Sequence, residues 1–171
     1  MLKIGTETPA MAEAIYRIHF EAFGRPNEGR LVDALRQGDT FVPELSLVAE
    51  LDGDLVGHIL FSRIQIRDGE MVHPALALAP LAVLPAYQRQ GIGSRLVSEG
   101  LAACASRGSE PVVVLGHPDY YPRFGFQPAS RFGIYPPFSV RDEVFMVWAG
   151  DWSQMKQIRG KVVYPAAFAG V

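Results

Sequence analysis

A nearly unbroken apolar run of ten residues, ALALAPLAVL at 75–84, precedes two closely spaced glycines, Gly91 and Gly93. Such a run is typical of a strand that is buried on both faces of a sheet. A helical pattern follows, and a β-branched run, PVVVLG at 111–116, comes after it. Strand, helix and strand in this order predict a right-handed crossover between two parallel strands. The apolar stripe of the predicted helix recurs every four residues, at Ile92, Leu96, Gly100 and Cys104.

Two helices are expected near the start of the chain. The first covers 8–24, with Thr8 as its cap, and the second covers 27–39, capped by Asn27. A short connection, GRP, joins them.

Further strands surround the crossover unit. They are expected at 2–7, 44–51, 55–66 and 144–150, with a hairpin at the DGD sequence and a turn region at 67–74. Strands clustered before a crossover helix predict an α/β (α+β) sandwich with a mixed sheet. The length of 171 residues suits one domain. We expect this domain at 2–150 and an apolar tail at 151–171 that packs on it.

Composition and charge exclude several classes of protein. The net charge is −2, and a nucleic-acid-binding surface requires a strongly basic face instead. Cys104 is the single cysteine, so no internal disulfide and no cysteine-rich metal site can form, and we expect no metal. No signal peptide and no apolar segment of about 20 residues is recognisable. The expected location is therefore the cytoplasm, without a membrane partner.

The two glycines stand where a strand becomes a helix. A helix N-terminus presents about four unpaired N–H groups and binds anions such as phosphates. Glycine lets such an anion approach the backbone, and Gln88, Arg89 and Ser94 add donors. The alternative is a glycine turn without a ligand, and the loop by itself favours neither interpretation. A P-loop and a dinucleotide-binding fingerprint are both excluded, because no Gly-Lys-Ser/Thr and no third glycine follow.

Two segments resemble motifs of a known family. QRQGIG at 88–93, after LAVLPAYQ, is similar to the Gln/Arg-x-x-Gly-x-Gly/Ala motif of the GNAT superfamily of acyl-CoA-dependent N-acetyltransferases. YYPRFGF at 120–126 is similar to the family's F-Y-x-x-x-G-F element. The similarity covers roughly residues 2–149. Together with the closing VVYPAAF, it resembles a small branch of predicted N-acetyltransferases whose acceptor is unknown.

The resemblance implies a GNAT-like, mostly antiparallel sheet that splays between strands 4 and 5, with helices on both faces. Pro80 is the expected place for the splay, because proline cannot donate to a sheet ladder. The implied cofactor is acetyl-CoA or another acyl-CoA, whose pantetheine arm would pair with the main chain of Leu81, Ala82 and Val83. Its pyrophosphate would bind at Gln88, Arg89, Gln90, Gly91, Ile92, Gly93 and Ser94.

The implied reaction is direct transfer of an acetyl group to a primary amine within a ternary complex. The motif makes Tyr121 the acid for the leaving thiolate, with Tyr120 as a competitor, and Leu81 or Ala82 supplies the oxyanion N–H. Strand 4 lacks the glutamate of many relatives, so the amine arrives neutral, loses its proton through water, or is deprotonated by His117. His117 can instead anchor its loop, and His19 and His58 are expected to be structural.

Partners and rival functions follow from the same resemblance. The acceptor is expected to be a small-molecule or peptide amine, and the connection carrying Arg25 and Glu28 can face it. The apolar tail is a candidate homodimer surface. The alternative function is a regulatory module that binds acyl-CoA without turnover, and the missing strand-4 acid favours it.

Overall fold

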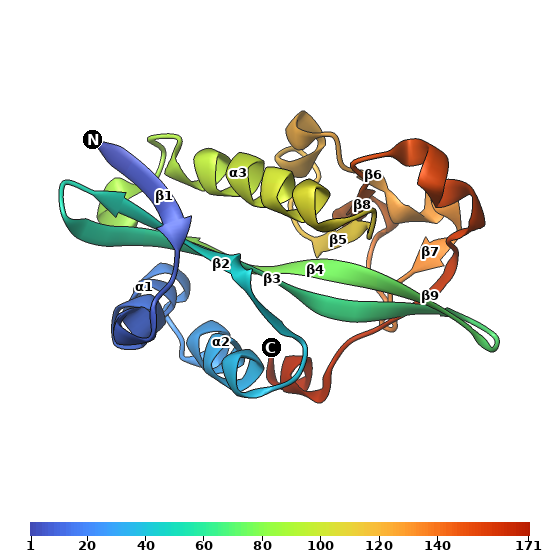
Figure 1. Ribbon diagram of the computed structural model, residues 1–171, viewed down its shortest axis with the longest axis horizontal. Helices are drawn as coiled ribbons and strands as arrows, with labels where there is room; N and C mark the ends of the chain where they lie inside the picture. Colours follow the sequence, from blue (N-terminus) through green and yellow to red (C-terminus); the bar gives the residue numbers. More distant parts are fainter.

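A nine-stranded sheet separates two groups of helices in the computed structural model, which describes residues 1–171 (Figure 1). The sheet order is β1-β2-β3-β4-β5-β8-β6, and β9 pairs with β3 and β7. Only β4–β5 and β7–β9 are parallel, so the predicted mixed, mostly antiparallel sheet is confirmed. The strands are β1 Leu2–Thr6, β2 Phe41–Leu51, β3 Asp54–Asp68, β4 Met71–Val83, β5 Val112–Leu115, β6 Gln127–Pro128, β7 Ile134–Tyr135, β8 Phe145–Trp148 and β9 Gly160–Val163.

Three α-helices cover the sheet. α1 (Ala12–Phe23) and α2 (Asn27–Gln37) lie on one face, and α3 (Ile92–Arg107) lies on the other (Figure 1). α3 approaches β3 closely, because a Cβ added at Gly100 would come within 2.3 Å of the Phe61 ring. Short 3₁₀ turns complete the chain: Pro9–Met11, Pro85–Tyr87, Tyr121–Phe124, Ala129–Phe132, Asp142–Val144, Trp152–Gln157 and Ala166–Gly170. No helix is both long and apolar enough to cross a membrane.

The strand–helix–strand crossover was predicted correctly. β4 and β5 pair in parallel on either side of α3. The single cysteine, Cys104, lies on the buried face of α3 with 2% of its surface exposed. Burial and the nearby Glu110 carboxylate raise the pKa of this thiol to about 12, so it stays protonated and unreactive.

The first hairpin occurs at the predicted DGD sequence, and the second lies within the expected turn region. Asp52 and Gly53 have φ values of 51° and 91°, which is the backbone of a type I′ turn. The second turn needs only Gly69 and Glu70, so the expected turn region at 67–74 was too wide. The other residues of the expected turn region pair between β3 and β4, and β4 begins at Met71 instead of residue 75.

The starts of the first two helices differ from the prediction. Residues 9–11 form a 3₁₀ turn, and the α-helix begins only at Ala12. Pro26 takes the N-cap position of α2, and Asn27 is its first residue. The Asn27 side-chain amide donates to the carbonyl oxygen of Gly170 at 2.8 Å. A tertiary contact with the tail therefore replaces the local cap.

The tail adds a strand to the sheet. β9 pairs with the second half of β3, where Gln65 lies opposite Val163 and Arg67 lies opposite Lys161. The chain then turns back, and its end lies beside α2 (Figure 1). The tail thus contacts both the sheet and the helical layer below it.

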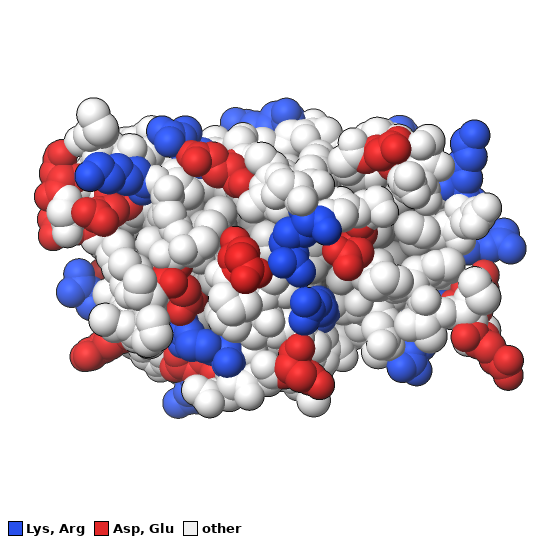
Figure 2. Space-filling model, viewed as in Figure 1, with Lys and Arg blue, Asp and Glu red and all other residues white.

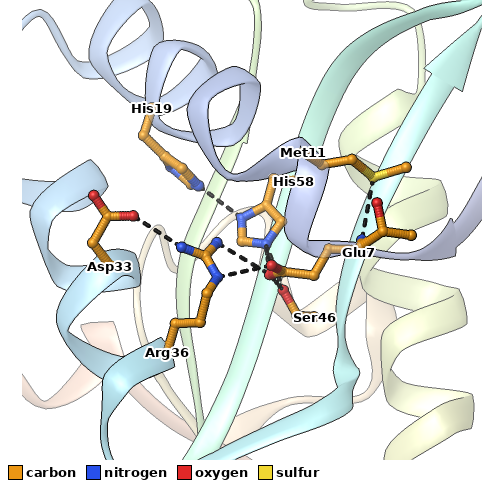
Figure 3. Close-up of polar contacts among 8 residues, drawn as sticks. Glu7, Met11, His19, Asp33, Arg36, Ser46 and His58 are labelled. Atoms are coloured by element: carbon orange, nitrogen blue, oxygen red, sulfur yellow. Dashed lines mark hydrogen bonds and ion pairs between the residues drawn. The ribbon is translucent and has the colours of Figure 1, made fainter.

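A buried polar chain links β1, β2 and β3 to both α1 and α2 (Figure 3). Ser46 Oγ donates to Glu7, so it accepts from Nε2 of His58 at 2.8 Å. Nδ1 of His58 is then an acceptor, and Nε2 of His19 donates to it at 2.8 Å. Arg36 closes the chain with an ion pair to Glu7 at 2.8 Å.

Burial sets the protonation of this chain. Desolvation, followed by the repulsion of His58, lowers the pKa of His19 to about 3. Desolvation also lowers the pKa of His58. Burial alone would raise the pKa of Glu7, but hydrogen bonds from His58, Arg36 and Ser46 outweigh it and lower the value to about 2. Both rings are therefore neutral and Glu7 is charged near pH 7, which agrees with structural roles for the two histidines.

Candidate functional site

β4 and β5 separate after a short stretch of pairing. They pair only at Leu76 with Val112 and at Ala77 with Val113. On the other side of β4, the register with β3 shifts so that two β4 residues, Ala79 and Pro80, stand opposite one β3 residue. This is a β-bulge at the expected proline, and it bends β4 away where the two strands part.

The next β4 residues present main-chain groups to the opened side. The N–H of Leu84 donates to the carbonyl of Val56, so Leu84 and, by alternation, Ala82 direct their main-chain groups toward β3. Leu81 and Val83 therefore direct theirs away from β3, toward the side that β5 has left. Of the two expected oxyanion donors, it is the N–H of Leu81 that faces the splay.

The start of α3 presents a run of unpaired donors. None of the six backbone N–H groups from Arg89 to Ser94 donates to another group of the protein, and the first helical bond runs from Arg95 to Gly91 at 3.0 Å. Gly91 has a φ of 84°, in the left-handed region that favours glycine. A Cβ at Gly91 would meet no atom within 4 Å, so the space beside it is open. We call residues 88–94 the N-terminal loop of α3.

Side chains connect this loop to its surroundings. The Gln88 amide donates to the carbonyl of Val83 at 2.9 Å, which ties the loop to the end of β4. The Ser94 hydroxyl lies 3.0 Å from the hydroxyl of Tyr120. Gln88, Arg89, Gln90 and Gly91 are exposed, Gly93 and Ser94 are half-buried, and Ile92 is buried in the core.

A cleft of about 1020 Å³ opens at the splay. Its walls come from the bulged part of β4, from β5, from the connection between α1 and α2, and from the tail. Most of the lining is apolar, including Leu31, Leu78, Leu81, Val114, Phe138 and Phe168, and the only charged lining residues are Arg25, Glu28 and Lys161. No cluster of His, Cys, Asp or Glu is placed to hold a metal ion.

Tyr121 lines this cleft. Its ring fills the space left by Gly116, because a Cβ there would come within 2.3 Å of the ring. The Tyr121 hydroxyl has no hydrogen-bond partner in the protein, and its ring meets Tyr120 edge-on at 5.1 Å. Burial, followed by the neighbouring Tyr120, raises the pKa of Tyr121 well above 10, so it is a neutral donor. Through these two tyrosines, the cleft adjoins the N-terminal loop of α3.

His117 does not line the cleft. Its side chain is 72% exposed and lies beside Asp119, with Nδ1 3.8 Å from the carboxylate. It lines a second pocket, together with Arg141 and Glu143, that meets the cleft at Leu115. The structure therefore brings Tyr121 and Leu81 together at the cleft but leaves His117 outside it.

The cleft contains residues that sequence reasoning did not single out. Tyr164 and Lys161, both from the tail, are among its lining residues. Tyr164 packs between Phe138 and Phe168, with ring centroids 6.1 and 4.9 Å away. No local pattern marks them, because β9 reaches the cleft only through its pairing with β3. Glu28 was considered for the acceptor side, and it lines the cleft with only 4% of its surface exposed.

Comparisons with known proteins agree with this architecture. The model of the Acetyltransferase (GNAT) family matches residues 12–126. The chain is 42% identical over 139 residues to the uncharacterized N-acetyltransferase YjhQ of Escherichia coli K12, covering 80% of this chain and 76% of that protein. It is 32% identical to the uncharacterized N-acetyltransferase YhbS of the same strain over 166 residues, covering 96% and 97% of the two chains.

Two solved structures are similar over nearly the whole chain. YhbS of Escherichia coli in complex with CoA superposes with a TM-score of 0.88 at 29% identity, covering 98% of this chain and 91% of that one. A GNAT family acetyltransferase of Brucella melitensis in complex with acetyl-CoA gives a TM-score of 0.80 at 35% identity, covering 98% of both chains. The family match, the relatives and the two similar structures agree, and the chain belongs to the GNAT family of N-acetyltransferases.

Proposed function

We propose that this protein binds acetyl-CoA across the N-terminal loop of α3 and transfers the acetyl group to a primary amine held in the cleft. The observation that carries the proposal is the run of six unpaired N–H groups at Arg89–Ser94, next to a splayed pair of strands. Unpaired N–H groups at a helix start suit a pyrophosphate. The CoA and acetyl-CoA complexes of the two similar structures support the same ligand here.

The pantetheine arm would follow the opened side of β4. The main-chain groups of Leu81 and Val83 are directed there, and an extended ligand can pair with them as an added strand does. The thioester would then lie near the bulge at Ala79 and Pro80, within the cleft that Tyr121 lines.

The transfer itself needs a neutral amine. An ammonium acceptor first loses one proton, which leaves through the open side of the cleft to water. The amine nitrogen then attacks the thioester carbonyl carbon, and the resulting oxyanion accepts a hydrogen bond from the N–H of Leu81. When the C–S bond breaks, the departing sulfur takes the second amine proton, with the neutral Tyr121 hydroxyl as its donor and relay. The products are the N-acetylated amine and CoA.

A second function is an acyl-CoA sensor without turnover. The cleft-lining part of β4, Ala77–Leu81, carries no ionisable side chain, and this absence of a base favours the alternative. Both functions require cofactor binding, so only turnover separates them.

The test begins with calorimetric titration of the protein with acetyl-CoA, CoA and 3′-dephospho-CoA. Micromolar binding of acetyl-CoA supports the proposed site, and at 100 times the dissociation constant it should stabilise the fold by about 2.7 kcal/mol. The saturated protein is then incubated with a panel of amines, and products are detected by mass spectrometry. Acetylated product supports the enzyme, binding without product supports the sensor, and absence of binding contradicts both.

A further inference from the structure

Arg25 and Glu28 form the only ion pair on the cleft wall. Nε of Arg25 donates to Oε1 of Glu28 at 3.0 Å, and an Nη nitrogen donates to Oε2. The pair is asymmetric: the side chain of Glu28 is 6% exposed, whereas that of Arg25 is 51% exposed. In an ordinary surface ion pair, both side chains are exposed to water. Here the carboxylate of Glu28 is buried at the edge of the cleft, and only Arg25 is exposed.

Both members keep hydrogen-bonding capacity. A carboxylate offers about four lone-pair sites and a guanidinium five N–H donors. The two hydrogen bonds between them occupy two N–H donors of Arg25 and two lone-pair sites of Glu28. Neither side chain has another partner in the protein. Glu28 can therefore still accept from an amine or ammonium, while the exposed part of Arg25 can still donate to an anion.

The rest of the cleft adds one more cation and an apolar body. Lys161 lines the cleft and forms no ion pair in the protein. Three charged side chains line the cleft, and they are two cations and one anion. Leu31, Phe138, Val163 and Phe168 provide apolar walls around them.

The connection between α1 and α2 holds this pair rigidly. α1 ends at Gly24 in the left-handed conformation, and Pro26 fixes the backbone before α2 begins. Only Arg25 lies between them, and Glu28 stands in the first turn of α2, where the helix dipole favours a carboxylate. The helix dipole explains why an acidic residue is favoured at this position. It does not explain why Glu28 is buried against an apolar cleft.

We propose that the Arg25–Glu28 pair recognises an acceptor that carries a carboxylate close to its amine, on an apolar body, as in an apolar α-amino acid. Glu28 receives the amine, Arg25 with Lys161 receives the carboxylate, and the apolar walls receive the side chain. The inference rests on the proposed function and narrows its acceptor. A polyamine or another polycation is disfavoured, because two of the three charged side chains that line the cleft are cations.

The experiment uses three probes of one shape: phenylalanine, phenylalanine amide and phenethylamine. Products are measured by mass spectrometry at saturating acetyl-CoA, and phenylalanine binding to the CoA-saturated protein is measured by calorimetry. The expected result is a kcat/KM for phenylalanine at least about tenfold above that of either probe without the carboxylate, equivalent to about 1.4 kcal/mol. Equal or better activity with phenethylamine, or with spermidine as a further probe, overturns the inference.

Variants separate the two partners. Arg25→Gln should lower the ratio of phenylalanine turnover to phenethylamine turnover at least about tenfold. Glu28→Gln should lower turnover of all three probes. Glu44→Gln is the matched control, because Glu44 pairs with Arg107 at the surface, away from the cleft. An unchanged preference in Arg25→Gln contradicts the inference.

Failure of the wider proposal has a different signature. If phenylalanine binds the CoA-saturated protein in an Arg25-dependent manner without any product, the ligand site stands and the enzyme proposal falls. If spermidine or phenethylamine is acetylated in preference to phenylalanine, the enzyme proposal stands and the acceptor inference falls. If phenylalanine neither binds nor reacts, the acceptor inference falls in either case.

Discussion

Nε2 of His19 lies 2.8 Å from Nδ1 of His58, and both imidazole rings are fully buried between α1 and the sheet. The rings can stay in this position only while they are neutral, because no carboxylate contacts His19 and its Nδ1 has no partner (Figure 3). This pair gives the fold a specific sensitivity to acid.

Stability should therefore fall as the pH drops below about 6.5. The folded protein holds the pKa of His19 at about 3, whereas the unfolded chain binds the proton near 6.5. Between these values the unfolded state binds more protons, so the free energy of unfolding falls with falling pH, by about 1.4 kcal/mol per pH unit for this histidine. Urea denaturation at pH 8, 6 and 5 measures the effect. Glu7 contributes only at lower pH, since its pKa falls from 4.5 to about 2.

His117→Gln serves as the control for this pH dependence. His117 is exposed, so its loss should leave the slope of stability against pH unchanged. His19→Phe should flatten the slope between pH 6.5 and 5. A slope that stays the same in His19→Phe would show that other groups cause the acid sensitivity.

A side chain at Gly91 should weaken acetyl-CoA binding. In Gly91→Val, the Cβ points into the open space beside the unpaired N–H groups, where a pyrophosphate would bind. We expect the dissociation constant to rise at least about tenfold in calorimetry, equivalent to about 1.4 kcal/mol. Gly69→Val is the matched control, since Gly69 also has a positive φ and open surroundings but lies at the opposite end of β4. Equal losses in the two variants would point to folding rather than to the ligand.

Tyr121→Phe should slow turnover and leave cofactor affinity nearly unchanged. The hydroxyl has no partner in the protein, so its removal costs the fold little. General acid catalysis contributes about 10² to 10⁴ in rate, and we expect a fall in kcat of at least about 10²-fold. Tyr164→Phe is the comparison, because Tyr164 is another phenol of the same cleft whose pKa is also raised by burial. A larger fall in kcat in Tyr164→Phe than in Tyr121→Phe would identify Tyr164 as the general acid.

The rate of transfer should follow the ionisation of the acceptor. Since His117 lies outside the cleft, kcat/KM is expected to rise with pH up to the pKa of the amine itself, without a second limb from His117. His117→Ala should reproduce the wild-type profile within about twofold. A second limb that is present in the wild type and disappears in His117→Ala would restore this histidine as the base.

Local sequence patterns predicted the parts of the fold that local chemistry determines. The turns at Asp52–Gly53 and Gly69–Glu70 follow from backbone preferences of single residues, and the crossover around α3 follows from the order of strand and helix patterns. The splay was implied by the resemblance, and the ladder chemistry of proline placed it at Pro80. The two glycines also predicted the strand-to-helix junction at the N-terminal loop of α3, whereas a ligand there was implied only by the family resemblance. These features need no information about distant segments.

Long-range contacts account for what the sequence concealed. Asn27 was predicted to cap α2, but its side-chain amide donates instead to the carbonyl of Gly170, 143 residues later in the chain. β9 forms part of the cleft wall because it pairs with β3, with Lys161 opposite Arg67. No periodicity in either segment predicts this pairing. Charge gave no guide to the site either, because acidic and basic side chains are interspersed over the face in Figure 2.

The inert Cys104 makes this protein convenient to assay. Free CoA reacts at once with colorimetric disulfide reagents, whereas the only protein thiol is 2% exposed and protonated, so the colour reports product alone. The same reagent measures a second quantity when no amine acceptor is present. Slow labelling of Cys104 then measures how often α3 lifts from the sheet, and bound acetyl-CoA should slow that labelling by fastening the start of the helix.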